Sequence, residues 1–117
     1  MNTSDYRTLQ FHDGVVSALR YAQKSAVSHR RMVCVAFTES TVTLTIDDTK
    51  TTTACATALN VPGASGNVLT SPDTTNAVFA PVPVAFNFQP NGTGTDRTLS
   101  IAGQTPIAVV GATGYVQ

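Results

Sequence analysis

The hydrophobic positions near the start of the chain repeat at helical spacing. At about 100° per residue, small and apolar side chains within residues 5–31 fall on one face, and polar side chains fall on the other. This spacing predicts one amphipathic helix, with Ser4 available to cap its start. The alanines on the apolar face should let the helix lie close against a sheet. That face consists of Phe11, Val15, Ala18, Leu19, Ala22, Ala26 and His29.

From Met32 onward the hydrophobic period becomes two, which predicts β-strands. Residues 32–37 (MVCVAF) are a mostly apolar run, typical of a buried strand. Residues 41–46 (TVTLTI) alternate outward threonines with inward apolar side chains, and the short linker before them predicts a hairpin. Residues 47–77 are rich in Thr, Gly, Pro, Asn and Asp, so we expect a long excursion with at most short strands.

The last third of the chain returns to the β pattern. We expect strands at 82–88, 97–102, 106–111 and 113–117, arranged as an antiparallel meander. An Asn-Gly pair between the first two of these strands is a hairpin-turn signal.

Together these elements predict an α+β fold in one domain. The helix of residues 1–31 should pack on an antiparallel β-sheet formed within residues 32–117, with a second small β region. A chain of 117 residues with 42% hydrophobic content can build a core. No run of 18 apolar residues occurs, so we expect no transmembrane helix within this chain, which should be soluble.

Charge is scarce and balanced. Seven basic residues face seven acidic ones, and charged residues make up 12% of the chain, against about 25% in typical domains. Threonine, serine, asparagine and glutamine supply the polar surface instead. This composition favours a β-rich protein that works outside the cytoplasm.

The two cysteines, Cys34 and Cys55, form no CxxC motif and no His/Cys cluster at metal-ligand spacing. The simplest prediction is one disulfide. Closing a loop of roughly 22 residues would contribute about 3 kcal/mol in the chain-entropy view, and the bond would persist in an oxidising compartment. Two buried free thiols are the alternative.

The residues that could support catalysis do not form a recognisable set. No GxSxG, HExxH, GxGxxG or P-loop pattern is present, and Glu39 is the only glutamate. Cys34 lies inside an apolar strand, where a structural role is expected. We therefore predict no catalytic residue, no metal and no cofactor.

A basic cluster near the end of the predicted helix consists of Arg20, Lys24, Arg30 and Arg31. These four residues could contact DNA phosphate or an acidic partner. Alternatively, they complement the dipole at the C-terminal end of the helix and keep one face solvated.

Three stretches of the chain together resemble the GspH/FimT family of minor pseudopilins and minor type IV pilins. They cover 45 of the 117 residues, in the order expected for the family. The first is similar to the family's helix-to-strand junction, the second to its glycine-containing turn between strands, and the third to its closing strand. The stretches are LRYAQKSAVSHRRMVCVAF (19–37), FNFQPNGTGTDRTLSI (86–101) and AVVGATGYVQ (108–117).

The resemblance implies a type IV pilin-like fold, in which the helix face of Val15, Ala18, Leu19, Ala22 and Ala26 packs on the sheet. It also implies a precursor with an upstream prepilin peptidase site and a hydrophobic helix, neither of which is present in this sequence. That helix would anchor the precursor in the bacterial inner membrane. After assembly, the globular domain would lie in the periplasm or on a cell-surface pilus.

The implied function is non-catalytic assembly of a type IV pilus or a type II secretion pseudopilus. The implied partners are other pilin or pseudopilin subunits, with a secreted substrate or DNA as further possibilities. DNA-binding relatives resemble one another in basic residues near the C-terminus, whereas GATGYVQ has none and Arg97 stands alone. A DNA-binding minor pilin and a free-standing β-sandwich adhesin module are the alternative functions.

Overall fold

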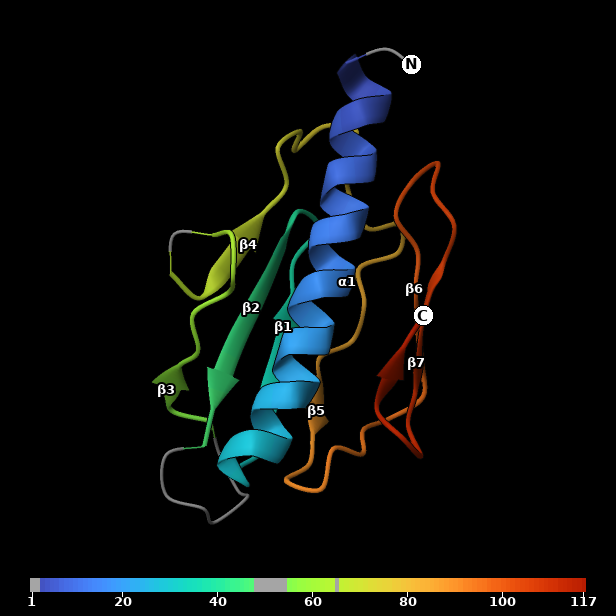
Figure 1. The fold of residues 1–117 in the computed structure, drawn as a ribbon. Helices are drawn as coiled ribbons and strands as arrows, with labels where there is room; N and C mark the ends of the chain where they lie inside the picture. The colour runs from blue at the N-terminus through green and yellow to red at the C-terminus, as the bar shows by residue number, and fades with distance from the viewer. Residues whose placement is uncertain (1–2, 48–54, 65) are drawn as a thin grey trace.

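The computed structural model of the protein describes residues 3–47, 55–64 and 66–117. One helix is followed by eight short strands, so the fold is α+β (Figure 1). The elements are α1 (Thr3–His29), β1 (Val33–Phe37), β2 (Thr41–Ile46), β3 (Thr57–Ala58), β4 (Val68–Thr70), β5 (Phe86–Phe88), β6 (Arg97–Leu99), β7 (Ile107–Val110) and β8 (Tyr115–Val116).

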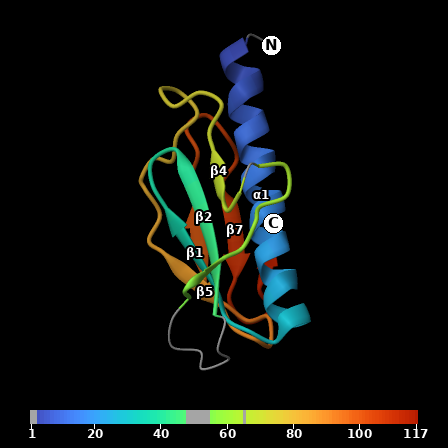
Figure 2. The same cartoon turned by 90° about the vertical axis from the view of Figure 1, so that its left-hand side faces the viewer.

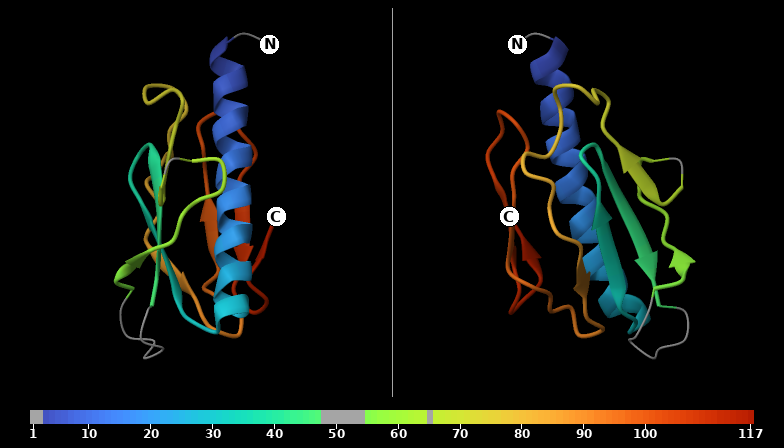
Figure 3. Two further views of the ribbon diagram at one scale, coloured as in Figure 1. Left: turned by 60° about the vertical axis from the view of Figure 1, so that its left-hand side comes forward. Right: turned by 180° about the vertical axis from the view of Figure 1, so that it is seen from behind.

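The helix α1 lies lengthwise against two antiparallel sheets. The first sheet has the order β3-β2-β1-β5, with β4 also paired to β2, and the second has the order β6-β7-β8. Figures 2 and 3 show α1 on one side of the first sheet and the second sheet beside it, with the N-terminal turns of the helix projecting past the strands. The expected helix on antiparallel sheets is therefore present.

The core lies between the apolar face of α1 and the inward side chains of both sheets. Six helix residues are at most 1% exposed: Phe11, Val15, Ala18, Leu19, Ala22 and Ala26. The β2 strand alternates half-buried threonines with buried apolar residues, as its period-two pattern predicts. Because alanine side chains are short, the helix backbone can approach the strands closely.

A chain of aromatic contacts links the helix to both sheets. The Phe79 ring lies 5.3 Å from Phe11 of α1 and 5.4 Å from Phe37 of β1, both edge to face. The Phe79 backbone also bridges Ile101, just beyond β6. Phe79 thus contacts the helix, the first sheet and the extension of the second sheet at once.

The sequence-based placement of His29 on the buried face is wrong. His29 is exposed, and its Nδ1 atom lies 2.9 Å from the Ser25 carbonyl oxygen. The reason is that α1 ends at His29, and residues 27–30 at this last turn are all exposed. The helical spacing of residues in the sequence continues to His29, but the buried face of the helix stops before its last turn.

The predicted strand at 82–88 also needs correction. Only Phe86–Phe88 is a strand, and it pairs with β1 in the first sheet, with Val35 opposite Phe86. Pro81 and Pro83 lack the N–H groups that a longer ladder would require. The C-terminal meander therefore contains three strands, all shorter than expected.

The Asn-Gly turn serves a different purpose from the expected hairpin. The Gly92 N–H donates to the Gln89 carbonyl at 2.8 Å, and the Gln89 N–H donates to the Thr93 carbonyl at 2.7 Å. This turn passes the chain from β5 in the first sheet to β6 in the second.

The hairpin of β1 and β2 and the excursion after it are as the sequence predicts. β1 and β2 pair over their length, and the excursion contains only the short strands β3 and β4 in its described part. A disulfide joins Cys34 of β1 to Cys55, with a sulfur–sulfur distance of 2.05 Å. It ties the excursion to the central strand of the first sheet.

Two glycines allow the second sheet to meet α1. Gly92 has φ +90° and Gly114 has φ +72°, a region that favours glycine. A Cβ atom on Gly114 would overlap the Gly92 carbonyl oxygen, and one on Gly92 would lie 2.8 Å from side-chain atoms of Gln23 and Val27. The turn at 92 and the turn before β8 therefore nest against each other beneath the helix.

We expect Gly114→Ala to lower the free energy of unfolding by about 3 kcal/mol, because a left-handed backbone strain of about 1 kcal/mol adds to the steric overlap. Gly103→Ala is the matched control. Gly103 has φ +77° and no atom within 4 Å of an added Cβ, so only the strain should appear. Urea denaturation measures both variants, and equal losses would show that the Gly92–Gly114 contact does not matter.

Candidate functional site

The four basic residues singled out in the sequence do not act as one group. Arg20 turns toward the C-terminal strand, where its Nε and Nη2 atoms donate to the Val116 carbonyl oxygen at 3.2 and 3.1 Å. Arg20 thus fastens β8 to the helix.

The other three residues, Lys24, Arg30 and Arg31, lie at the C-terminal end of α1 and are called the basic end below. Lys24 and Arg30 are exposed, and Arg31 is half-buried. Cations at this position complement the partial negative charge of the helix C-terminus.

The helix terminates in a Schellman motif built on an arginine. The Arg30 N–H donates to the Val27 carbonyl at 3.3 Å, and the Arg31 N–H donates to the Ala26 carbonyl at 3.2 Å. Arg30 has φ +54°, the left-handed conformation in which glycine is usual. The chain keeps an arginine here despite the conformational cost.

Arg30→Gly should therefore raise the free energy of unfolding by about 0.5–1 kcal/mol, because glycine adopts this conformation without strain. Arg30→Ala removes the same charge but keeps the Cβ atom, so it should leave stability within about 0.5 kcal/mol of the wild type. Thermal and urea unfolding distinguish the two. A gain in Arg30→Ala equal to that in Arg30→Gly would attribute the effect to charge rather than to backbone strain.

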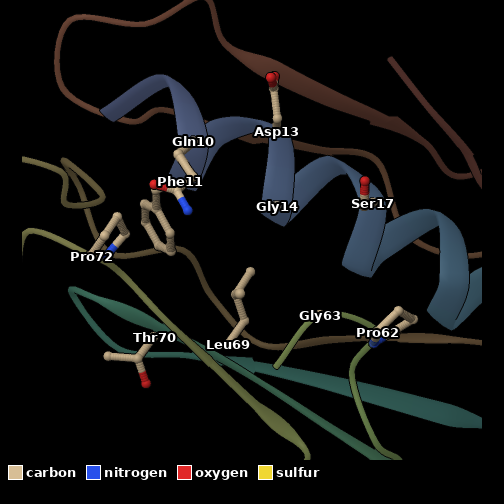
Figure 4. A pocket seen from close by; sticks show the side chains of 10 residues that line it. All are labelled: Gln10, Phe11, Asp13, Gly14, Ser17, Pro62, Gly63, Leu69, Thr70 and Pro72. Carbon is tan, nitrogen blue, oxygen red and sulfur yellow. The ribbon is translucent and has the colours of Figure 1, made fainter. Parts of the chain in front are cut away.

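A groove of about 370 Å³ runs between α1 and the β4 side of the first sheet (Figure 4). Phe11 and Leu69 point into it, whereas Asp13 and Ser17 point away from it. Two prolines stand at its edges. The lining residues are Gln10, Phe11, Asp13, Gly14, Ser17, Pro62, Gly63, Leu69, Thr70 and Pro72.

Gly14 is the unusual residue of this groove. A glycine inside a helix costs about 1 kcal/mol relative to alanine. Its backbone is helical, and an added Cβ would lie 3.4 Å from Leu69 Cδ2, an ordinary van der Waals distance. Packing therefore does not require glycine here, and its missing side chain deepens the groove. A single glycine inside the predicted helix is the feature of the sequence that could have indicated this groove.

We expect Gly14→Ala to raise the free energy of unfolding by about 1 kcal/mol, since it improves helix propensity and fills space beside Leu69. Ser17→Ala, one turn later and exposed, should give about half that gain or less. Chemical denaturation of both variants tests this. A loss of stability in Gly14→Ala would mean that Leu69 cannot accommodate the methyl group.

The acidic, histidine and cysteine side chains of the described residues lie apart from one another, except in pairs. Among them, no three His, Cys, Asp or Glu side chains lie together as possible metal ligands. His12 Nδ1 lies 3.2 Å from the Asp13 carboxylate, whose side chain is 71% exposed. Both described cysteines are in the disulfide.

Comparison with known proteins gives no assignment. No family model, curated protein or solved structure matches this chain. In the described part of the chain, no helix combines the length and the apolar character needed to cross a membrane. Function is therefore inferred from the chain's own sequence and architecture.

Proposed function

We propose that this chain is the globular part of a minor pilin or pseudopilin, a structural subunit of a type IV pilus or a type II secretion pseudopilus. The sequence stretches at 19–37, 86–101 and 108–117 support this function through their resemblance to the GspH/FimT family. The role is assembly by packing, without a chemical step.

The observation that supports the proposal most is the position of α1. The helix has 27 residues, about 40 Å at 1.5 Å per residue, in a molecule whose longest dimension is 45 Å. Its middle turns, as far as Ala26, are covered by the sheets, while Tyr6 near its start is 62% exposed. A helix placed in this way suits continuation into an upstream hydrophobic segment that would lie inside a fibre.

The disulfide is consistent with assembly outside the cytoplasm. The bond between Cys34 and Cys55 requires an oxidising compartment, such as the bacterial periplasm. It also joins Cys55, at the start of a described part of the excursion, to β1, and the excursion would contact neighbouring subunits on that side.

The first test is the coding sequence upstream of residue 2 in the source bacterium. We expect a prepilin peptidase site followed by a hydrophobic helix in frame with α1. The second is to shear the fibres from the cells and probe for this chain by immunoblot. It should appear with the other pilins, and deletion of its gene should reduce piliation or secretion, with recovery on complementation.

An upstream secretion signal without a peptidase site, together with absence from sheared fibres, would instead favour the free-standing adhesin module. These observations concern membership in a fibre. They do not depend on which surface of the domain contacts a neighbour.

A further inference from the structure

We propose that successive copies of this chain bind end to end, with the basic end of one copy against an acidic end of the next. The acidic end is defined by Glu39 and Asp73. This inference rests on the proposed function and deepens it by naming the partner, a second copy of this chain, and the surfaces involved.

The charges on the described residues are separated along the molecule. The cations of the second half of α1 include the basic end, Lys24, Arg30 and Arg31. Glu39, Asp73 and Asp13 lie toward the opposite end. Asp47 is buried beside the basic end, where its N–H donates to the Met32 carbonyl, and the three cations still leave that end positive overall. Charge is scarce in this chain, at 12% of residues, so a few side chains determine the sign of each end.

Hydrogen bonds hold the acidic end together. Glu39 is exposed at the tip of the β1–β2 hairpin, and its carbonyl accepts the Phe79 N–H at 2.9 Å. The Ser71 N–H donates to the Ser40 carbonyl at 2.8 Å, which fixes the start of the loop that contains Asp73. The loop and the hairpin tip therefore form one surface.

Asp73 carries its negative charge at neutral pH. A hydrogen bond from the Asn76 side chain lowers the pKa of Asp73, and the backbone N–H groups of Asn76 and Thr75 lower it further. The charge of Arg7 makes the smallest contribution to this lowering. Arg7 therefore lies at this end too, and Asp13 on the same half of α1 offsets it, so the balance stays negative.

The two ends lie in opposite halves of the molecule along α1. Figure 1 shows the β1–β2 connection and the loop after β4 beside the N-terminal half of α1, whereas the helix ends at the far side of the molecule. The remaining charged pair on the second sheet, Asp96 and Arg97, is adjacent in sequence and neutral overall. The charge separation thus follows the axis along which copies would stack.

Because the two ends carry opposite charge, they favour head-to-tail association of copies. A basic end attracts an acidic end, while two like ends repel each other, so the contact is heterologous and can repeat along a line. Exposed apolar side chains add contact area at both ends: Val27 is 45% exposed beside the basic end, and Leu9 is 36% exposed near the start of α1. Exposed ion pairs contribute about 0.2–1 kcal/mol each, so the isolated domain should associate weakly.

The experiment measures the average mass of the purified chain by sedimentation over a concentration series. At about 0.01 M salt, where charges act over about 30 Å, the mass should rise with concentration. At about 1 M salt it should stay that of the monomer. Reversing the basic end with Lys24→Glu, Arg30→Glu and Arg31→Glu should abolish association, and so should reversing the acidic end with Glu39→Lys and Asp73→Lys.

An equimolar mixture of the two reversed proteins should associate again at low salt, because each then offers ends of the sign that the other lacks. Misfolding would not produce this recovery. The two reversed proteins have net charges of −6 and +4, so the acidic-end variant is also mixed with an unrelated monomeric protein of net charge −6, which should bind it less than the basic-end variant does. The control variant Thr98→Glu adds charge on an exposed position of β6, away from both ends, and should associate like the wild type.

A wild-type chain that stays monomeric at low salt would overturn the proposal, as would a mixture that does not recover. A mobility shift of duplex DNA that persists near physiological salt and disappears on reversal of the basic end would assign that end to nucleic acid instead. None of these results alters whether the chain has an upstream peptidase site or occurs in sheared fibres, so the two proposals fail separately.

Discussion

The close packing of α1 on both sheets is the contact on which the rest of the structure depends. The two sheets share little backbone pairing with each other, apart from the bridge between Phe79 and Ile101. They are joined mainly because each buries apolar side chains against the same helix. The helix can pack closely on both sheets because three of its buried side chains are short, the alanines at 18, 22 and 26. Larger side chains there would push the sheets away from it.

The second sheet needs more than apolar burial to stay in place, because its strands are only two to four residues long. The Gly92–Gly114 contact lets its last turn come close to α1, and the Arg20 guanidinium holds the Val116 carbonyl from the helix side. Asp96 adds a third tie by accepting the Gly111 N–H at 2.6 Å. Glycine and single polar contacts thus replace the long ladders of an ordinary sheet.

The sequence pattern predicted the elements that depend only on neighbouring residues. The helical period and the β1–β2 hairpin follow from side-chain spacing within one stretch of chain, so the sequence was sufficient. The pairing of β5 with β1 is a contact between distant segments, and two prolines shortened the strand in a way that alternation alone did not reveal. The groove beside Gly14 was not predicted for the same reason, because its other wall is formed by Pro62, Gly63, Leu69, Thr70 and Pro72.

The sparse charge of this chain also limits which surfaces can specify an orientation. The outward face of β2 presents the hydroxyls of Thr41, Thr43 and Thr45, which can contact a neighbour but do not distinguish one direction from the other. Hydroxyls donate and accept equally, whereas a carboxylate only accepts and a guanidinium only donates. In a molecule with so few ionised groups, the direction of a contact can be set only where charges of one sign gather, and in the described part of this chain Lys24, Arg30 and Arg31 form such a group.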